Sequence, residues 1–216
     1  YGRTRGRETK SQKEGYAQAD GQNLAERGQT DLFNVVKEAK VLKEVGDDYP
    51  YTAAAELESP VYINFGSDNA PAPWNNTTTG SLTTVADNHG NNTGMSLSVI
   101  SGFQPNATSG MSGTTTVLNM PDAVSQSNLY GTSTSEFVIS NLSSDTDYKF
   151  TIYASRNSNG NRTALYTVTG KTVKTAELDA SQNTSNVAVV DKVSPDGNGN
   201  ISIKVSLATG NDQNYY

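Results

Sequence analysis

The clearest structural signal in the sequence is the stretch Asp147-Tyr148-Lys149-Phe150-Thr151-Ile152-Tyr153-Ala154-Ser155. Its aromatic and aliphatic residues at 148, 150, 152 and 154 alternate with Lys149, Thr151 and Tyr153. Successive side chains of a β-strand point to opposite faces of the sheet, so a period of two places one set of residues on a single face. The stretch therefore predicts a β-strand that is buried on one side.

The same alternation returns in six other places between residue 61 and residue 207. These places are 61–65, 95–99, 136–139, 165–168, 187–190 and 201–207. The last of them follows Asp196-Gly197-Asn198-Gly199, a strong turn signal. Short strands with frequent turns and no helices between them predict an all-β sandwich of about eight strands. A further strand is expected to begin near Tyr215 and to be cut short, which favours a piece of a longer polypeptide.

Residues 1–60 are built differently, because they hold 20 of the chain's 38 charged residues. Within them, residues 30–46 are predicted to form a helix that Thr30 caps and Gly46 ends. Apolar residues at helical spacing give this helix one stripe, formed by Leu32, Val35, Val36, Ala39 and Leu42. We therefore expect residues 1–60 to be a charged helical arm and linker that serves as an anchor or in oligomerisation, and residues 61–216 to be the β-sandwich.

Composition excludes several classes of function. A net charge of −6 and a pI near 4.8 argue against a nucleic-acid-binding role, which needs a basic face. No apolar run approaches the roughly 18–20 residues that span a bilayer. The absence of cysteine removes disulfides and thiolate metal sites. Only 34% of the residues are hydrophobic, a content that one-sided strands and long polar loops explain.

Several local motifs resemble a known family over residues 61–216. They include Ile63-Asn64-Phe65-Gly66, Pro73-Trp74-Asn75-Asn76, Tyr148 to Arg156, and Val193 to Gly199. Together they resemble the non-catalytic β-sandwich modules of secreted Bacteroidota proteins, which often accompany esterase or glycoside-hydrolase domains. The resemblance implies a galactose-binding-like, jelly-roll fold. Residues 1–60 lie outside it, and their layout resembles the anchoring arms of phage fibre and decoration proteins.

Catalytic and metal sites are poorly supported by the sequence. The only histidine, His89, lies in the polar stretch 87–91, and no Gly-x-Ser-x-Gly motif accompanies it. We expect an exposed loop residue there and no catalytic residue in the chain. Asp196, Asn198 and Asn200 alternate as calcium ligands do, but the closing glutamate of a calcium loop is absent, so a plain hairpin turn is favoured. No metal ligand or cofactor is assigned, although a structural calcium ion held by another combination of loops stays open.

Glycan binding is the sharpest functional hypothesis. Trp74 lies between Pro73 and Asn75-Asn76, in what is expected to be a loop, where an indole offers a flat surface to a sugar ring. The expected ligand-binding residues are Trp74, Asn75, Tyr130, Tyr153, Arg156 and Arg162. The competing interpretations are that Trp74 closes one end of the core and that the two arginines bridge loop backbone.

The sequence therefore predicts a non-catalytic extracellular recognition or adhesion module, secreted or displayed on a cell or virion surface, for a glycan or cell-surface polysaccharide. The arm would tether it to a larger assembly, to a continuation of its own chain or to further copies. One alternative is a structural virion fibre or capsid decoration protein that is anchored through residues 1–46. Another is the accessory domain of a secreted esterase or glycoside hydrolase.

Overall fold

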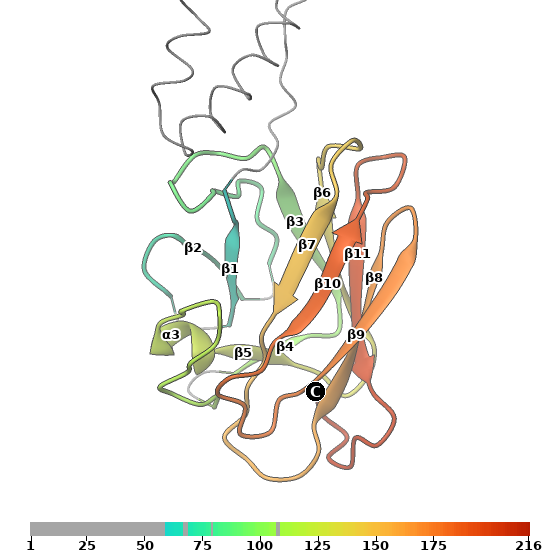
Figure 1. Ribbon diagram of the computed structural model, residues 1–216. Helices are drawn as coiled ribbons and strands as arrows, with labels where there is room; N and C mark the ends of the chain where they lie inside the picture. The colour runs from blue at the N-terminus through green and yellow to red at the C-terminus, as the bar shows by residue number, and fades with distance from the viewer. Residues whose placement is uncertain (1–58, 67–68, 79, 107–108) are drawn as a thin grey trace, which may run out of the picture. The chain divides into compact units, whose positions relative to one another are not determined.

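The computed structural model describes residues 59–66, 69–78, 80–106 and 109–216 (Figure 1). The expected arm helix at 30–46, with its stripe of Leu32, Val35, Val36, Ala39 and Leu42, lies outside the described residues. Within the described residues, the chain consists of β-strands joined by turns and loops, with a single short helix, α3 (Asp122–Ser125). The prediction of an all-β class is confirmed. None of the described helices has the length and apolar character needed to cross a membrane.

The largest element is an antiparallel sheet of five strands in the order β3-β6-β11-β8-β9. Its strands are β3 (Ser96–Ser101), β6 (Ser135–Ser140), β8 (Thr163–Thr169), β9 (Val173–Asp179) and β11 (Ile201–Leu207). The central strand, β11, pairs with β6 on one side and β8 on the other, in registers that put Ile203 opposite both Phe137 and Val168. Apolar side chains of three strands therefore gather on one face.

Three smaller ladders complete the described part of the chain. Strands β7 (Tyr148–Ile152) and β10 (Ala188–Val193) pair antiparallel, with an irregularity in register between Val190 and Val193. Strands β1 (Tyr62–Phe65) and β2 (Trp74–Thr77) pair in parallel, and β4 (Gln104–Asn106) pairs antiparallel with β5 (Asn128–Tyr130).

The core forms where β10 packs against the five-stranded sheet. On β11 and β8 every second residue is buried, and Ile201 and Ile203 are 0% and 1% exposed. Val190 and Val193 of β10 belong to the same apolar cluster as these isoleucines. Figure 1 shows β7 and β10 in front of this sheet. Burial at every second position is the pattern that the sequence predicted, and it explains how a chain with 34% hydrophobic residues builds a core.

Two local features fix the entry to β7 and β11, and the second belongs to the turn that the sequence predicted at 196–199. The backbone N–H of Ser143 donates to the Tyr148 hydroxyl at 2.9 Å, the arrangement of a tyrosine corner. Gly199 has a φ of +74°, and a Cβ built there would lie 2.8 Å from the carbonyl oxygen of Leu142. Glycine is therefore required at this turn, both by its backbone conformation and by the close approach of the neighbouring loop.

All seven strands that were read from alternation are present, but the sequence missed others. Strand β9 lies at the edge of the sheet and has mostly exposed residues, so its apolar pattern is weak. Trp74, which was expected in a loop, instead begins β2. Residues 208–216 form no strand within the described chain. Instead, Tyr216 and Gly131 exchange two backbone hydrogen bonds. The N–H of Tyr216 donates to the Gly131 carbonyl at 3.2 Å, and the N–H of Gly131 donates to the Tyr216 carbonyl at 3.3 Å.

Candidate recognition surface

The structure divides the six residues that were predicted to bind a ligand into separate groups. Trp74 and Tyr153 pack against one small apolar cluster, formed by Ala70, Met120 and Val124. Tyr130 and Arg162 lie elsewhere, each next to the ring of Tyr215. Neither Asn75 nor Arg156 belongs to the apolar cluster or to the aromatic and cation–π contacts of Tyr215. The chain therefore offers two places, and not one, where aromatic side chains from the predicted set come together.

Trp74 has a structural role in the fold. Its ring is partly buried and lies 5.1 Å, centroid to centroid, from that of Tyr62 on the paired strand β1. Its neighbour Asn75 donates both amide hydrogens to backbone carbonyls, those of Tyr62 and Ala86, and its Oδ1 accepts the Ala86 N–H. Asn75 therefore joins β1 to a loop, and its amide hydrogens are already committed to the fold.

Tyr153 and Arg156 hold the segment that follows β7. The Tyr153 hydroxyl donates to the Asn183 carbonyl at 2.7 Å, and its partial burial raises the pKa of the phenol. The backbone of Arg156 donates to Ala180 and accepts from Gln182, both at 2.7 Å. These bonds tie residues 153–156 to residues 180–183. Both residues thus have a structural role that is visible in their hydrogen bonds.

The other group stands on the C-terminal loop, residues 208–216, which one side chain organises. Asn211 donates from Nδ2 to the carbonyls of Thr163 and Tyr215, and its Oδ1 accepts the N–H groups of Gln213 and Asn214. A single partly buried amide thereby fixes the path of the loop. At its end, the Tyr216 hydroxyl hydrogen-bonds the Ser133 carbonyl and the Ser135 hydroxyl. Tyr216 is thus anchored inward while Tyr215 is left 44% exposed.

Around Tyr215 lie an aromatic ring, a cation and amide groups, which together we term the Tyr215 surface (Tyr130, Tyr215, Arg162, Gln104 and Gln213). The rings of Tyr130 and Tyr215 are 6.1 Å apart and inclined at 54°, within the range of favourable aromatic pairs. The guanidinium carbon of Arg162 lies 5.9 Å from the centre of the Tyr215 ring, a cation–π distance. The Tyr130 hydroxyl donates to Gln104 Oε1 at 2.7 Å, and Arg162 donates to Gln213 Oε1 at 3.3 Å.

The positive charge of Arg162 on this surface has the carboxylate of Asp212 nearby. Asp212 accepts hydrogen bonds from the Gln213 side chain and from the backbone N–H of Asn161. These bonds, with a smaller contribution from the charge of Arg162, hold the pKa of Asp212 below its usual value. The carboxylate is therefore ionised at neutral pH and offsets the arginine. The exposed ring of Tyr215 and the partly buried ring of Tyr130 thus lie with an arginine and amides, next to the Asp212 carboxylate, and this combination favours a neutral, polar ligand.

Sequence reasoning found Tyr130 and Arg162 but missed Tyr215 and Gln213. Tyr215 was assigned to the start of a strand, where alternate residues are buried, and no local signal showed that the chain would turn at Asn211. The loop is held by long-range hydrogen bonds, from Asn211 to Thr163 and between Tyr216 and Gly131, which join positions that are far apart in the sequence. Only the folded chain brings them together.

The other sites weighed in the sequence take simple forms. Asp87 Oδ1 accepts the backbone N–H groups of His89 and Asn91, so His89 lies in a tight polar turn. Asp196 Oδ1 likewise accepts the N–H groups of Asn198 and Asn200, so these residues form a tight turn. The turn is not the hairpin that was expected, because β10 before it pairs with β7 and β11 after it pairs with β6 and β8. Among the residues that the structure describes, no three of His, Cys, Asp or Glu are grouped as metal ligands.

Comparison with known proteins found no matching family model, no matching curated protein and no matching solved structure.

Proposed function

We propose that this chain is a non-catalytic recognition module that binds a neutral glycan through the Tyr215 surface. The observation that carries the proposal is the exposed ring of Tyr215, flanked by Tyr130 and Arg162 and bordered by two glutamine amides. Tyrosine and arginine are enriched where proteins bind partners, because they combine a large rigid surface with a polar tip.

Sugar chemistry fits these groups. A pyranose ring carries C–H bonds on its faces, which pack on a phenol ring, and hydroxyl groups on its rim, which exchange hydrogen bonds with amides and a guanidinium. The carboxylates of Asp212 and of Asp179, which accepts the Arg162 backbone N–H, offset the charge of Arg162, so the surface is not a cationic site for an acidic ligand. A shallow surface of this kind gives weak binding to one sugar, so repeated sugars or repeated copies of the module would raise the avidity.

The finer fold assignment belongs to the same proposal. We infer a jelly-roll-like β-sandwich, in which the β7–β10 ladder forms part of the layer opposite the five-stranded sheet. The tyrosine corner at Tyr148 and the shared core of β10 and β11 support this assignment. It agrees with the resemblance to galactose-binding-like modules and with an extracellular location. The alternative roles, virion decoration or accessory hydrolase domain, rest on residues 1–46 or on chains outside this one, and they stay hypotheses.

The test is a glycan array probed with the full chain, followed by titration of the best ligand against matched variants. Tyr215→Ala is expected to weaken binding at least about tenfold, a change of about 1.4 kcal/mol, whereas Tyr215→Phe keeps the ring and most of the affinity. Val117→Ser, at a residue that is 82% exposed and outside the surface, is the control and is expected to bind normally. Thermal melts check that each variant is folded.

Trp74→Ala decides between the two aromatic groups. If Trp74 is the sugar-binding platform that the sequence suggested, this change abolishes glycan binding without unfolding the domain. Loss of binding in Trp74→Ala together with normal binding in Tyr215→Ala would move the glycan to the Trp74 group and overturn the assignment made here. An array with no ligand for the intact chain would contradict glycan recognition altogether.

A further inference from the structure

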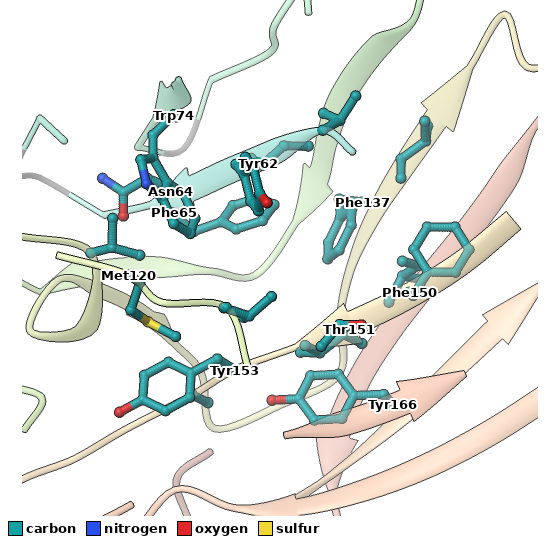
Figure 2. A pocket seen from close by; sticks show the side chains of 18 of the residues that line it. Tyr62, Asn64, Phe65, Trp74, Met120, Phe137, Phe150, Thr151, Tyr153 and Tyr166 are labelled. Carbon is teal, nitrogen blue, oxygen red and sulfur yellow. The ribbon is translucent and has the colours of Figure 1, made fainter. Parts of the chain in front are cut away.

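Strand β7 leads from the core into a loop, residues 153–162, that ends at the start of β8. Figure 2 shows Phe150 and Thr151 of β7, and Tyr153 just after the strand, beside a cavity of about 680 Å³ at the core. Further along the loop the chain is no longer covered, and Asn159 and Gly160 are both exposed. This part of the loop is therefore open to reaction with water.

The exposed part of the loop contains one of the two Asn-Gly pairs in the sequence, which are Asn159-Gly160 and Asn198-Gly199. In such a pair the backbone nitrogen of the glycine can attack the side-chain carbonyl carbon of the asparagine, because glycine has no side chain to hinder the approach. Both asparagines are exposed, so burial of the asparagine does not distinguish the two pairs. Their hydrogen bonds do distinguish them.

The attacking nitrogen is engaged in one pair and available in the other. The N–H of Gly199 donates to the Asp196 carbonyl at 3.1 Å, inside the turn that the Asp196 side chain also holds. The N–H of Gly160 donates to none of the residues that the structure describes. Attack by the Gly199 nitrogen therefore requires the turn to open first, whereas attack by the Gly160 nitrogen does not.

The carbonyl group of Asn159 has a hydrogen-bond donor in place for the reaction. Asn159 Oδ1 accepts a hydrogen bond from Gln182 Nε2 at 2.5 Å. When a nitrogen adds to this carbonyl carbon, negative charge develops on Oδ1, and a donor that is already positioned stabilises that charge. Gln182 therefore polarises the side-chain amide of Asn159 toward attack.

We propose that Asn159 is a site of spontaneous modification, at which Gly160 supplies the nucleophile and Gln182 stabilises the developing charge. The Gly160 nitrogen forms a bond to Asn159 Cγ, the Cγ–Nδ2 bond breaks, and ammonia leaves with the proton that the Gly160 nitrogen has lost. Water then opens the resulting cyclic imide. Attack of water on Cγ gives aspartate, and attack on the backbone carbonyl carbon gives isoaspartate, in which the main chain runs through Cγ.

The modification changes the border of the Tyr215 surface. Either product adds a negative charge, and isoaspartate also lengthens the main chain by one methylene just before Gly160. The φ of Gly160 is +94°, and a Cβ built there would lie 2.3 Å from Gln213 Nε2, so the fold itself favours the glycine that makes the pair reactive. Because Gly160 packs this closely against Gln213, isoaspartate is expected to displace Gln213 from its hydrogen bond with Arg162.

The experiment incubates the full chain at mildly alkaline pH, where the attacking nitrogen loses its proton most easily, and follows the conversion by mass spectrometry. Trypsin releases Asn159 in peptide 157–162 and Asn198 in peptide 193–204, so both pairs are measured in one sample. Asn159 is expected to convert at least about tenfold faster than Asn198. Synthetic peptides of the same two sequences give the rates without the fold, and Asn198 is expected to convert more slowly in the chain than in its peptide.

Variants of Gln182 test its part in the reaction. Gln182→Ala removes the donor, and Gln182→Glu keeps the size of the side chain but replaces the donor with an acceptor. Both are expected to slow conversion at Asn159 about two- to tenfold, the effect of one hydrogen bond on a rate, and to leave Asn198 unchanged. Gln182 is exposed, and thermal melts check that both variants fold. Hydrogen–deuterium exchange at residues 211–216 is expected to be faster in the converted chain than in the fresh chain.

Two results would overturn the proposal. If Asn159 converts no faster than Asn198, the loop protects the pair. If both Gln182 variants convert at the rate of the unchanged protein, Gln182 takes no part, and the reactivity is that of any exposed Asn-Gly pair.

The converted chain is also expected to bind the array ligand less tightly, an expectation that rests on the proposed function. The conversion itself is measured without a ligand, so the modification and the glycan-binding function can fail separately.

Discussion

Strands β11 and β7 border the same interior but are completed to different degrees. β11 lies between two partner strands, and its inward residues Ile201, Ile203 and Val205 are buried. β7 has the clearer alternation in the sequence, yet among the described strands it pairs only with β10, and none of its five residues is buried. The comparison shows that an alternating pattern specifies which face of a strand is apolar. It does not specify whether the strand's neighbours are present to cover that face.

Truncation on β11 gives the largest expected effect. Ile203→Ala removes buried methyl groups from a site that is enclosed by β6, β8 and the cluster around Val190. Because the walls cannot collapse fully, the free energy of unfolding is expected to fall by about 2–5 kcal/mol. Urea unfolding, followed by tyrosine and tryptophan fluorescence, measures it. A loss below about 1 kcal/mol would mean that the core around Ile203 is loosely packed.

The matched change on β7 tests whether β7 is less completely buried than β11. Ile152→Ala removes the same atoms from a side chain that is only partly buried, so the expected loss is smaller, about 1–2 kcal/mol. The informative quantity is the difference between the two variants, measured under identical conditions. If Ile152→Ala costs as much as Ile203→Ala, β7 is as fully covered in solution as β11.

The same contrast separates what the sequence could predict from what it could not. The strand at 148–152 and the turn at 196–199 follow from local patterns, which the folded chain confirms. The edge strand β9 was missed because an exposed strand needs few apolar residues. The Tyr215 surface was only half found, because Tyr215 is placed by Asn211 and by contacts with Thr163 and Gly131. Such long-range contacts leave no periodic signal in the sequence.

Although β7 is open along one edge, its first residue is firmly held. Tyr148→Phe removes the hydroxyl that accepts the Ser143 N–H and leaves that donor without its partner in the tyrosine corner. The expected cost is about 1 kcal/mol, the net value of one such hydrogen bond. Ser143→Ala is the matched control, since it keeps the backbone N–H and is expected to cost little. Equal losses in the two variants would show that the loop, and not this hydrogen bond, holds the strand.

The smallest expected effect concerns the start of β1. There the N–H of Asn88 donates to the Pro60 carbonyl at 3.0 Å, from a turn that the Asp87 carboxylate organises. Partial desolvation opposes ionisation of Asp87, but hydrogen bonds from the Asn91 side chain and from the backbone of Asn91 and His89 outweigh it and lower the pKa.

A carboxylate with a lowered pKa in the folded state stabilises the protein above its unfolded pKa, near 3.8, and this contribution is lost as the pH falls through the folded value. Asp87→Asn is therefore expected to melt slightly below the unchanged protein at pH 7, and the gap is expected to close in acid below pH 3.8. Asp145→Asn removes an exposed carboxylate outside this turn and serves as the control. Melting temperatures measured across this range test the sign. A difference in melting temperature that widens in acid would mean that the ionised Asp87 carboxylate does not stabilise the turn that holds the start of β1.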